Sequence, residues 1–276
     1  MKFYRDTVAA GKTIMRRIIA STRIKNEKGQ KRNQKINPTR ETVQKVNLRN
    51  AVWTLCALLN TYFEKEDLWI TFTYASEPGK AQAKRDLDNL IRNLRNHHRK
   101  NNRAFRWIAA TEYKNKRIHH HFVCSRTELK VIEKYWTHGW ITPKFLDASG
   151  NYLKLAEYII KETDKTFRED DAPNKTRYRR SRNMPLPEAK REAVTDKELR
   201  EGPKEIKGYR VDEDTVHKYE HAILGVECMQ YIMVSLESKP RLKRWYRGKT
   251  VKLEGEYKLP EEKQLIFDEL IYDRED

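Results

Sequence analysis

Hydrophobic residues recur at helical spacing in a long segment of the first quarter of the chain. After Pro38, with Thr39 placed to cap the first turn, apolar residues return every three or four positions up to Glu64. Side chains at this spacing lie on one face of a helix, so the pattern predicts a helix with one buried face over residues 39–64. Residues 1–35 show no sustained period and predict either a hairpin or a short helix, ending in a polar and basic connection.

Strands and helices are predicted in alternation over the next hundred residues. β-branched and aromatic stretches predict the strands, and helical periodicity predicts the helices between them. The expected elements are strands over 68–74, 105–113, 117–125 and 139–146, and helices over 79–100, 127–137 and 151–163. This order is typical of the split βαβ arrangement, in which helices cover one face of an antiparallel sheet and leave the other open. We therefore predict an α+β fold with a central antiparallel sheet and a smaller C-terminal region.

A charged segment interrupts these patterns. Residues 164–207 contain four prolines and no sustained period, which predicts a linker or an extended arm. Beyond it, residues 219–236 are apolar enough to pack, and residues 250–276 predict a hairpin and an acidic final helix. The expected organisation has four parts: a basic N-terminal segment (1–38), a central domain (39–165), a basic linker or arm (166–207) and a C-terminal accessory region with an acidic tail (208–276).

The charge of the chain is strongly positive and unevenly distributed. The 276 residues include 58 Lys and Arg against 40 Asp and Glu, a net charge of +18. Nine acidic and three basic residues lie between positions 253 and 276, so the rest of the chain carries a net charge of +24. This balance favours a polyanionic partner such as nucleic acid, without selecting an activity.

Cysteine usage and hydropathy argue against secreted and membrane proteins. Cys56, Cys124 and Cys228 are far apart and form no C-x-x-C pair, so neither a disulfide framework nor a cysteine zinc site is expected. The longest apolar runs fall short of the roughly 20 residues that span a membrane, and the amino terminus lacks the apolar core of a secretion signal. We therefore expect a cytoplasmic protein without a membrane partner.

Three consecutive histidines lie in the predicted strand 117–125. Because side chains alternate across a strand, His120 shares a face with the apolar residues, and His119 and His121 lie together on the other face. Two neighbouring imidazoles can bind one divalent cation. A run of surface histidines is the alternative explanation of this pattern.

The preceding strand offers a third ligand. If residues 115–116 form a two-residue turn, antiparallel pairing places Glu112 opposite His119 and the small Ala110 opposite His121. Directly opposed residues share a face, so Glu112 joins the histidines and Ala110 leaves space for an ion. A carboxylate with two imidazoles suits Mg²⁺ or Mn²⁺, with positions left for phosphate oxygens and water.

A candidate nucleophile lies in the predicted helix 151–163. Tyr158 and Lys161 project from one face of this helix, while Ile159 and Ile160 can face inward. A phenol is a weak nucleophile until a cation lowers its pKa or polarises the phosphate that it attacks, and Lys161 and the metal could do both. Taken alone, this spacing is also that of an ordinary aromatic residue on a helix.

In their order along the chain, these motifs resemble those of the HUH endonucleases, in particular the single-tyrosine initiators of rolling-circle replication. The resemblance extends over about residues 68–165. It rests on the strand Thr71-Phe72-Thr73-Tyr74, on Glu112 with His119 and His121, and on Tyr158 with Lys161. It implies that residues 39–165 form an HUH nuclease domain, with Thr71, Thr73 and Tyr74 among the DNA-binding residues.

The resemblance implies a metal-dependent, site-specific endonuclease and ligase for single-stranded DNA. Tyr158 would attack a phosphodiester to give a 5′-phosphotyrosine link and a free 3′-hydroxyl, and the reaction would later be reversed to rejoin the strand. The implied DNA is the single-stranded or hairpin origin of a plasmid, phage or other mobile element. The implied partners are a host polymerase and, because no helicase P-loop follows, a host helicase.

Departures from the family pattern leave alternatives open. Some phage initiators carry a second tyrosine three or four residues from the first, whereas Tyr152 lies six residues before Tyr158. Related transposases tend to end the helix motif with Gln, whereas Glu162 follows Lys161 here, which favours an initiator. A relaxase or transposase with the same site is one alternative, and a non-catalytic basic DNA-binding regulator is another.

Two further sets of residues complete the sequence predictions. A segment with four arginines and one tyrosine could clamp phosphates and stack on an unpaired base, or it could be a solvated arm. This segment comprises Arg177, Tyr178, Arg179, Arg180 and Arg182. His97 and His98, at the end of a basic helix, are expected at the surface.

Overall fold

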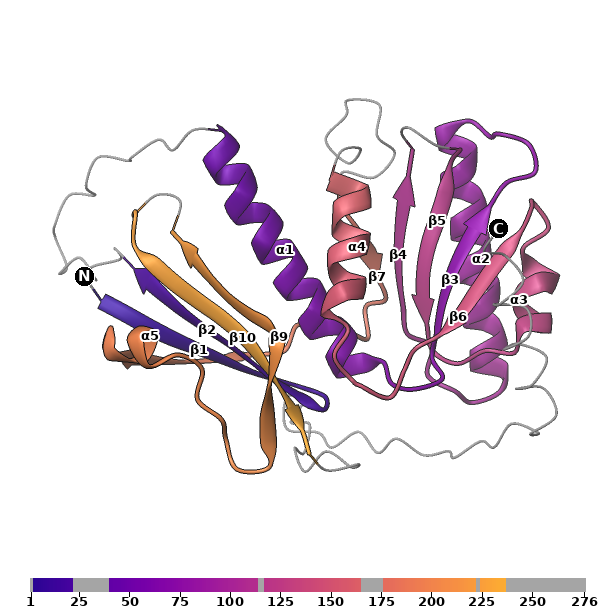
Figure 1. Ribbon diagram of the computed structural model, residues 1–276. Coiled ribbons are helices and arrows are strands. Elements are labelled where there is room, and N and C mark those ends of the chain that lie inside the picture. The colour runs from indigo at the N-terminus through magenta and orange to yellow at the C-terminus, as the bar shows by residue number, and fades with distance from the viewer. Residues whose placement is uncertain (1, 22–39, 114–116, 165–175, 222–223, 237–276) are drawn as a thin grey trace, which may run out of the picture. The chain divides into compact units, whose positions relative to one another are not determined.

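The computed structural model describes residues 2–21, 40–113, 117–164, 176–221 and 224–236 (Figure 1). Contacts between Cα atoms group residues 1–240 into one compact unit and residues 241–276 into another. Several predicted features lie outside the described residues, namely the cap at Thr39, the basic connection before it, the turn at 115–116, and the hairpin and acidic helix of 250–276. The division of the chain into four parts stays a prediction.

A five-stranded antiparallel sheet, which we call the site sheet, forms the predicted central sheet. Its strand order is β6-β3-β5-β4-β7. The strands are β3 (Leu68–Thr73), β4 (Trp107–Glu112), β5 (His119–Cys124), β6 (Ile141–Phe145) and β7 (Arg179–Arg180). The first four confirm strands predicted from the sequence, and the α+β class is confirmed with them.

Two helices cover one face of the site sheet. α2 (Lys80–Lys100) and α3 (Leu129–Tyr135) share an apolar core with β3, β4 and β5. Alternation along β3 turns Leu68, Ile70 and Phe72 into this core, where all three are fully buried. Burial of one such side chain contributes about 1.5–3 kcal/mol, so the core fixes which residues of β3 emerge on the opposite face.

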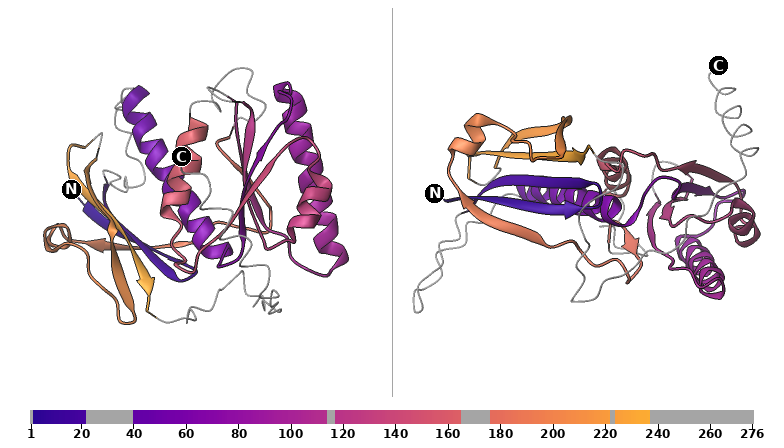
Figure 2. Two further views of the ribbon diagram at one scale, coloured as in Figure 1. Left: turned by 45° about the vertical axis from the view of Figure 1, so that its right-hand side comes forward. Right: turned by 90° about the horizontal axis from the view of Figure 1, so that it is seen from below.

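The opposite face of the site sheet is partly covered by the last helix of the predicted domain. α4 (Leu153–Asp164) contacts β4 and packs along α1 (Arg40–Tyr62), as Figures 1 and 2 show. The structure differs here from the expected open face, because periodicity predicts that a helix has an apolar side but not which surface receives it. Buried Ala156, Ile159 and Ile160 form that apolar side.

A second five-stranded antiparallel sheet combines segments from the two ends of the described chain. Its strand order is β8-β1-β2-β10-β9. The strands are β1 (Lys2–Ala10), β2 (Thr13–Ser21), β8 (Ala189–Val194), β9 (Tyr209–Glu220) and β10 (Glu227–Ser235), and the short helix α5 (Lys197–Glu201) contacts β10. Of the two expectations for the first residues, the hairpin is confirmed. Its turn includes Gly11 with φ of 58°, a left-handed conformation that glycine adopts readily.

The segment expected to be an irregular linker contributes β7, β8 and α5. β8 is an edge strand whose side chains are exposed or half-buried, and it pairs with β1 through the backbone. Charged side chains connect the two strands, since Arg191 binds the buried Asp6 at 2.6 Å and Arg5 binds Glu192 at 2.7 Å. A charged edge strand has no hydrophobic period, so patterning along the sequence could not reveal it.

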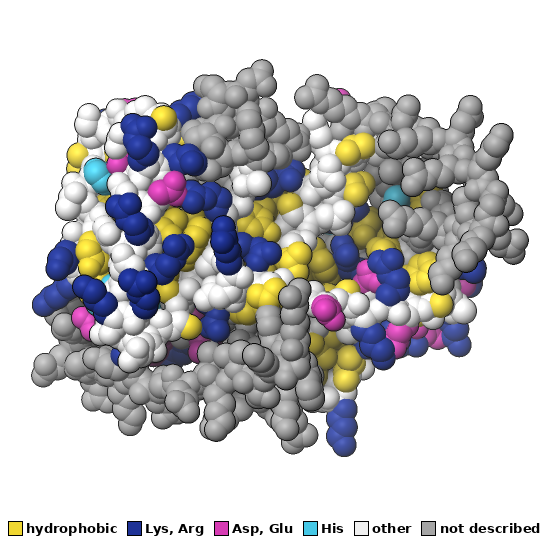
Figure 3. All heavy atoms as spheres, turned by 180° about the vertical axis from the view of Figure 1, so that it is seen from behind, with side chains coloured by type: hydrophobic (Ala, Val, Ile, Leu, Met, Phe, Trp, Pro, Cys, Tyr) yellow, Lys and Arg dark blue, Asp and Glu magenta, His cyan; other side chains and the backbone are white. Residues whose placement is uncertain are grey.

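The surface and the cysteines agree with the composition. Figure 3 shows Lys and Arg side chains gathered on the face seen from behind, and α2 exposes Arg85, Arg92, Arg95 and Arg99. All three cysteines are free and buried. Within the described part of the chain, no helix combines the length and the apolar character that crossing a membrane requires.

His98, expected at the surface, is buried at the end of α2. It is 3% exposed, its Nε2 lies 2.8 Å from the Thr127 hydroxyl, and its ring packs on Phe105 with centroids 4.7 Å apart. The surface expectation was wrong because the chain turns back after α2, where the Arg103 amide donates to the His98 carbonyl. Burial, reinforced by His97 and Arg103, lowers the pKa of His98 to about 4.

We expect His98 to make the protein less stable in acid. Its folded-state pKa lies below the ordinary 6.5, so the unfolded state binds more protons between these values and the free energy of unfolding falls as pH drops through this window. His98→Gln, which keeps a polar partner for Thr127, should remove up to about 3 kcal/mol of this loss. Urea unfolding of both proteins near pH 7 and near pH 4.5 measures the difference, and equal losses in the two would contradict the assignment.

Candidate active site

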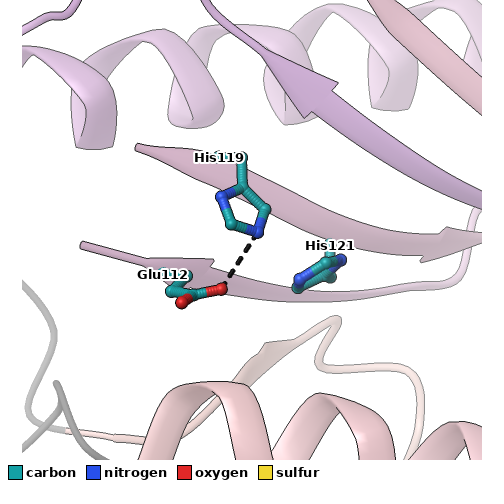
Figure 4. A group of neighbouring side chains, drawn as sticks. All are labelled: Glu112, His119 and His121. Atoms are coloured by element: carbon teal, nitrogen blue, oxygen red, sulfur yellow. Dashed lines mark ion pairs between the residues drawn. The ribbon is translucent and has the colours of Figure 1, made fainter. Parts of the chain in front are cut away.

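Glu112, His119 and His121, which we call the ligand set, converge on the face of the site sheet that α4 partly covers (Figure 4). β4 and β5 pair with Glu112 opposite His119 and Ala110 opposite His121, so the predicted register is confirmed. The candidate ligand atoms of the three residues lie within 4.8 Å of one another, and all three residues are buried. This spacing is compatible with a single divalent cation bound between them.

Backbone hydrogen bonding orients His119 within the ligand set. Its Nδ1 lies 2.9 Å from the carbonyl oxygen of Arg117, which can only accept, so Nδ1 carries the proton and donates. The lone pair on Nε2 then faces a carboxylate oxygen of Glu112 at 3.0 Å. Two acceptors at this distance repel each other unless they share a cation, either a proton or a metal ion. The chemistry of the donor set therefore fits a divalent metal.

His120 belongs to the core, as the alternation predicted. It is fully buried, with Nδ1 2.8 Å from the Thr111 hydroxyl and Nε2 2.9 Å from the Tyr74 hydroxyl. Burial, with the neighbouring His119 and His121, lowers the pKa of His120 to about 3, so the ring is neutral at pH 7. The two hydrogen bonds hold the centre of β5, and thereby the two flanking histidines, in place.

Tyr158 projects from α4 towards the ligand set. Its ring centroid lies 5.0 Å from that of His121 and 5.6 Å from that of Trp69, both in edge-to-face contact. The residue is still 39% exposed, so a DNA strand can reach it. Partial burial, followed by the negative charges of Glu162 and Glu112, raises the pKa of the phenol, which favours its protonated form until a cation is nearby.

Lys161 follows Tyr158 by one turn of α4, as predicted. Its side chain is exposed, and among the described residues it forms no hydrogen bond or ion pair. An ammonium on a flexible four-carbon stem can therefore approach a phosphate bound near Tyr158 without first breaking an ion pair. Its catalytic role stays a prediction.

A buried amide fixes the start of the helix that carries Tyr158. Asn60, 2% exposed, donates from Nδ2 to the Thr13 hydroxyl at 2.9 Å and accepts the backbone N–H of Tyr152 at Oδ1, also at 2.9 Å. Tyr152 immediately precedes α4, and its hydroxyl donates to the carbonyl oxygen of Asp147. One side chain of α1 thus connects the hairpin of the second sheet to the nucleophile helix.

Asn60→Ala should impair nicking through the position of α4. The substitution leaves the Tyr152 N–H and the Thr13 hydroxyl without their buried partner, at a cost of about 1–3 kcal/mol each. We expect the single-turnover nicking rate to fall about tenfold while DNA affinity changes little, because the displaced group is the nucleophile. Asn50→Ala, which removes an exposed amide of the same helix, is the control. Unchanged nicking by a folded Asn60→Ala protein would refute this positioning role.

The β3 motif divides between the two faces of the site sheet. Thr71 and Thr73 are paired with the two histidines of the ligand set, so both hydroxyls emerge beside it. Tyr74 is 3% exposed and lies in the core on the other side, where its hydroxyl contacts His120. DNA cannot reach Tyr74 in this conformation, which corrects its inclusion among the DNA-binding residues. The alternation that placed Phe72 in the core already indicated this orientation.

The arginine-rich segment is largely engaged within the protein. Three of its arginines have internal partners: Arg177 binds Asp164 at 2.6 Å, Arg179 binds Asp88 at 2.5 Å, and Arg180 donates to the backbone carbonyl of Met184. Arg179 and Arg180 also form β7, which pairs with the edge of β4. Arg182 is exposed and Tyr178 is half-buried. A structural role accounts for three arginines, and DNA binding by this segment stays a prediction.

The sequence predictions missed two residues beside the site. Trp69 supports the ring of Tyr158, and Asn60 holds the start of α4. The alternation of β3 does place Trp69 on the face of Thr71, which was the available signal. Asn60 had no comparable signal, because its two partners lie far away in the sequence.

Comparison with known proteins reaches the part of the chain that builds this site. No curated protein and no solved structure gives a match. Residues 67–167 match the model of one protein family, and this range includes the ligand set, Tyr158 and Lys161. The matched family is that of the replication-associated protein ORF2, which supports a role for this chain in the initiation of DNA replication.

Proposed function

We propose that this protein nicks and rejoins single-stranded DNA at an origin of rolling-circle replication, with the chemistry of an HUH endonuclease. The nucleophile is Tyr158, and Glu112, His119 and His121 hold a divalent metal, Mg²⁺ or Mn²⁺. The observation that carries the proposal is the contact between Tyr158 and His121, whose ring centroids lie 5.0 Å apart. A nucleophile and a cation must meet at one phosphate, and this contact gives them a common position.

The proposed reaction is a phosphodiester transesterification. The phenolic oxygen of Tyr158 forms a bond to the scissile phosphorus, the bond from phosphorus to the 3′-oxygen breaks, and that oxygen takes up a proton as a free 3′-hydroxyl. The DNA downstream remains attached through a 5′-phosphotyrosine. One phosphodiester replaces another, so attack by a 3′-hydroxyl on this link reverses the reaction and rejoins the strand.

The side chains have distinct tasks in this scheme. A metal bound to the ligand set would supply positive charge to the phosphate oxygens and favour ionisation of the phenol. Trp69 holds the Tyr158 ring through a second edge-to-face contact besides that with His121, which limits the orientations of its hydroxyl. Lys161 is placed to neutralise charge on the phosphate from α4.

The proposed cellular role follows from the products. A free 3′-hydroxyl primes a host polymerase, and strand separation is assigned to a host helicase. Residues 39–165 serve as the nuclease domain in this proposal, and the single-stranded or hairpin origin of a mobile element is its substrate. The family match over residues 67–167 supports an initiator over the alternative of a DNA-binding regulator.

The polarity of the adduct tests this proposal. Single-stranded oligonucleotides from the protein's own origin, labelled at either end, would be incubated with the protein and Mn²⁺ or with a chelator. We expect only the 3′-terminal label to stay with the protein in denaturing electrophoresis, and only when the metal is present. A 5′-terminal label on the protein, or the absence of any adduct with a cleavable origin strand, would contradict the chemistry.

A further inference from the structure

An exposed tryptophan lies on the strand at the open edge of the site sheet. Trp140, immediately before β6, is 61% exposed, a large value for an aromatic side chain with so much apolar surface. Its position is set by a close approach of two backbones. A Cβ atom on Gly139 would lie 2.3 Å from the carbonyl oxygen of Thr73, so glycine is needed where the chain meets β3.

Register places Trp140 on the same face as the ligand set. The Thr73 N–H donates to the Trp140 carbonyl, and Thr73 is itself paired with His119. Alternation then turns Thr142 and Lys144 to this face as well. Lys144 confirms the orientation, because its Nζ lies 5.4 Å from the centre of the Trp69 ring.

These side chains form a continuous surface, which we call the β6 strip: Trp140, Thr142 and Lys144, backed by Thr71 and Thr73. The three residues on the edge itself, Trp140, Thr142 and Lys144, are all exposed. Neither β3 nor residues 140–145 contain an acidic residue, so nothing on these two segments repels a phosphate. At about 3.3 Å per residue, Trp140 and Lys144 stand about 13 Å apart along the edge.

The chemistry of the strip fits one strand of nucleic acid. An exposed indole offers a stacking surface to an unpaired base, and a lysine offers a charge to a phosphate. The strip also continues into the active site, because the Trp69 ring contacts both Lys144 and Tyr158. A duplex presents its bases edge-on and gives the indole no face to stack on, so the exposed ring favours a single strand.

We propose that the β6 strip binds the single-stranded DNA next to the nick site, with Trp140 stacking on a base and Lys144 contacting a phosphate. This inference rests on the proposed nicking function and adds the path of the substrate away from Tyr158. β6 is an edge strand, so pairing with a second copy of the chain is the competing use of the same surface.

The test measures binding without chemistry. Full-length protein carrying Tyr158→Phe would be titrated with a fluorescent oligothymidylate of about 20 nucleotides in the presence of a chelator. We expect Trp140→Ala to weaken binding about tenfold, and Trp140→Phe to retain most of the affinity, since stacking needs only an aromatic face. Lys144→Gln should lower the slope of log affinity against log salt by about 0.7, the value for one contact to a single strand.

Phe145→Ala is the matched control. Phe145 is a large residue of the same strand, 45% exposed, but paired with Leu68 and therefore on the opposite face. Equal losses from Trp140→Ala and Phe145→Ala, or no loss from Trp140→Ala, would overturn the strip. A change of oligomeric state in Trp140→Ala, with unchanged affinity, would assign the edge to self-association instead. The adduct assay reports separately on the nicking function, which survives any of these results.

Discussion

Tyr158→Phe is expected to abolish the covalent protein–DNA adduct and to reduce nicking on the order of 10⁴-fold or more, the scale on which loss of a nucleophile acts. The substitution removes only the attacking oxygen. The ring contacts with His121 and Trp69 are kept, so binding of single-stranded DNA should change by less than about threefold. Quantified adduct formation, with binding measured in parallel, separates the two effects.

Tyr152→Phe provides the matched control for this result. Tyr152 is the other tyrosine near the start of α4, but it is buried and its hydroxyl donates to the Asp147 carbonyl 3.0 Å away. Its pKa is raised by burial and then by the charge of Asp147, which disfavours a nucleophilic role further. We expect the adduct to persist in Tyr152→Phe. Loss of the adduct in this protein, with retention in Tyr158→Phe, would move the nucleophile.

His121→Ala is expected to lower metal-dependent nicking at least about 100-fold, since it removes one of three candidate ligands. Titration calorimetry with Mn²⁺ should show a matching loss of metal affinity, and Glu112→Gln should act in the same direction. His217→Ala removes an exposed histidine of the second sheet and serves as the control. Full Mn²⁺ binding by His121→Ala would show that the ligand set is not the metal site.

The site sheet could be predicted because its signals are local. Alternation in β3 and β5 fixed which side chains are buried, and a short connection between β4 and β5 made the register of Glu112 and His119 predictable. The second sheet could not be predicted in the same way. Its strands come from segments nearly two hundred residues apart, and β8 pairs with β1 without any apolar pattern.

The candidate site was predictable up to the point where elements must be placed in three dimensions. The sequence indicated that Glu112, His119 and His121 share a face, and that Tyr158 lies on a helix. The approach of that helix depends on its packing against α1 and on the hydrogen bonds of Asn60, which connect distant parts of the chain. The burial of Tyr74 was predictable from alternation.

The most direct test of the account is to identify the residue that carries the DNA. An adduct formed with the wild-type protein, an origin oligonucleotide and Mn²⁺ would be digested with nuclease and protease, and the modified peptide sequenced by mass spectrometry. The account predicts a nucleotide attached through phosphate to Tyr158, and no modified peptide when the metal is chelated. A nucleotide on any other residue would contradict the claim that the phenol beside the ligand set is the nucleophile.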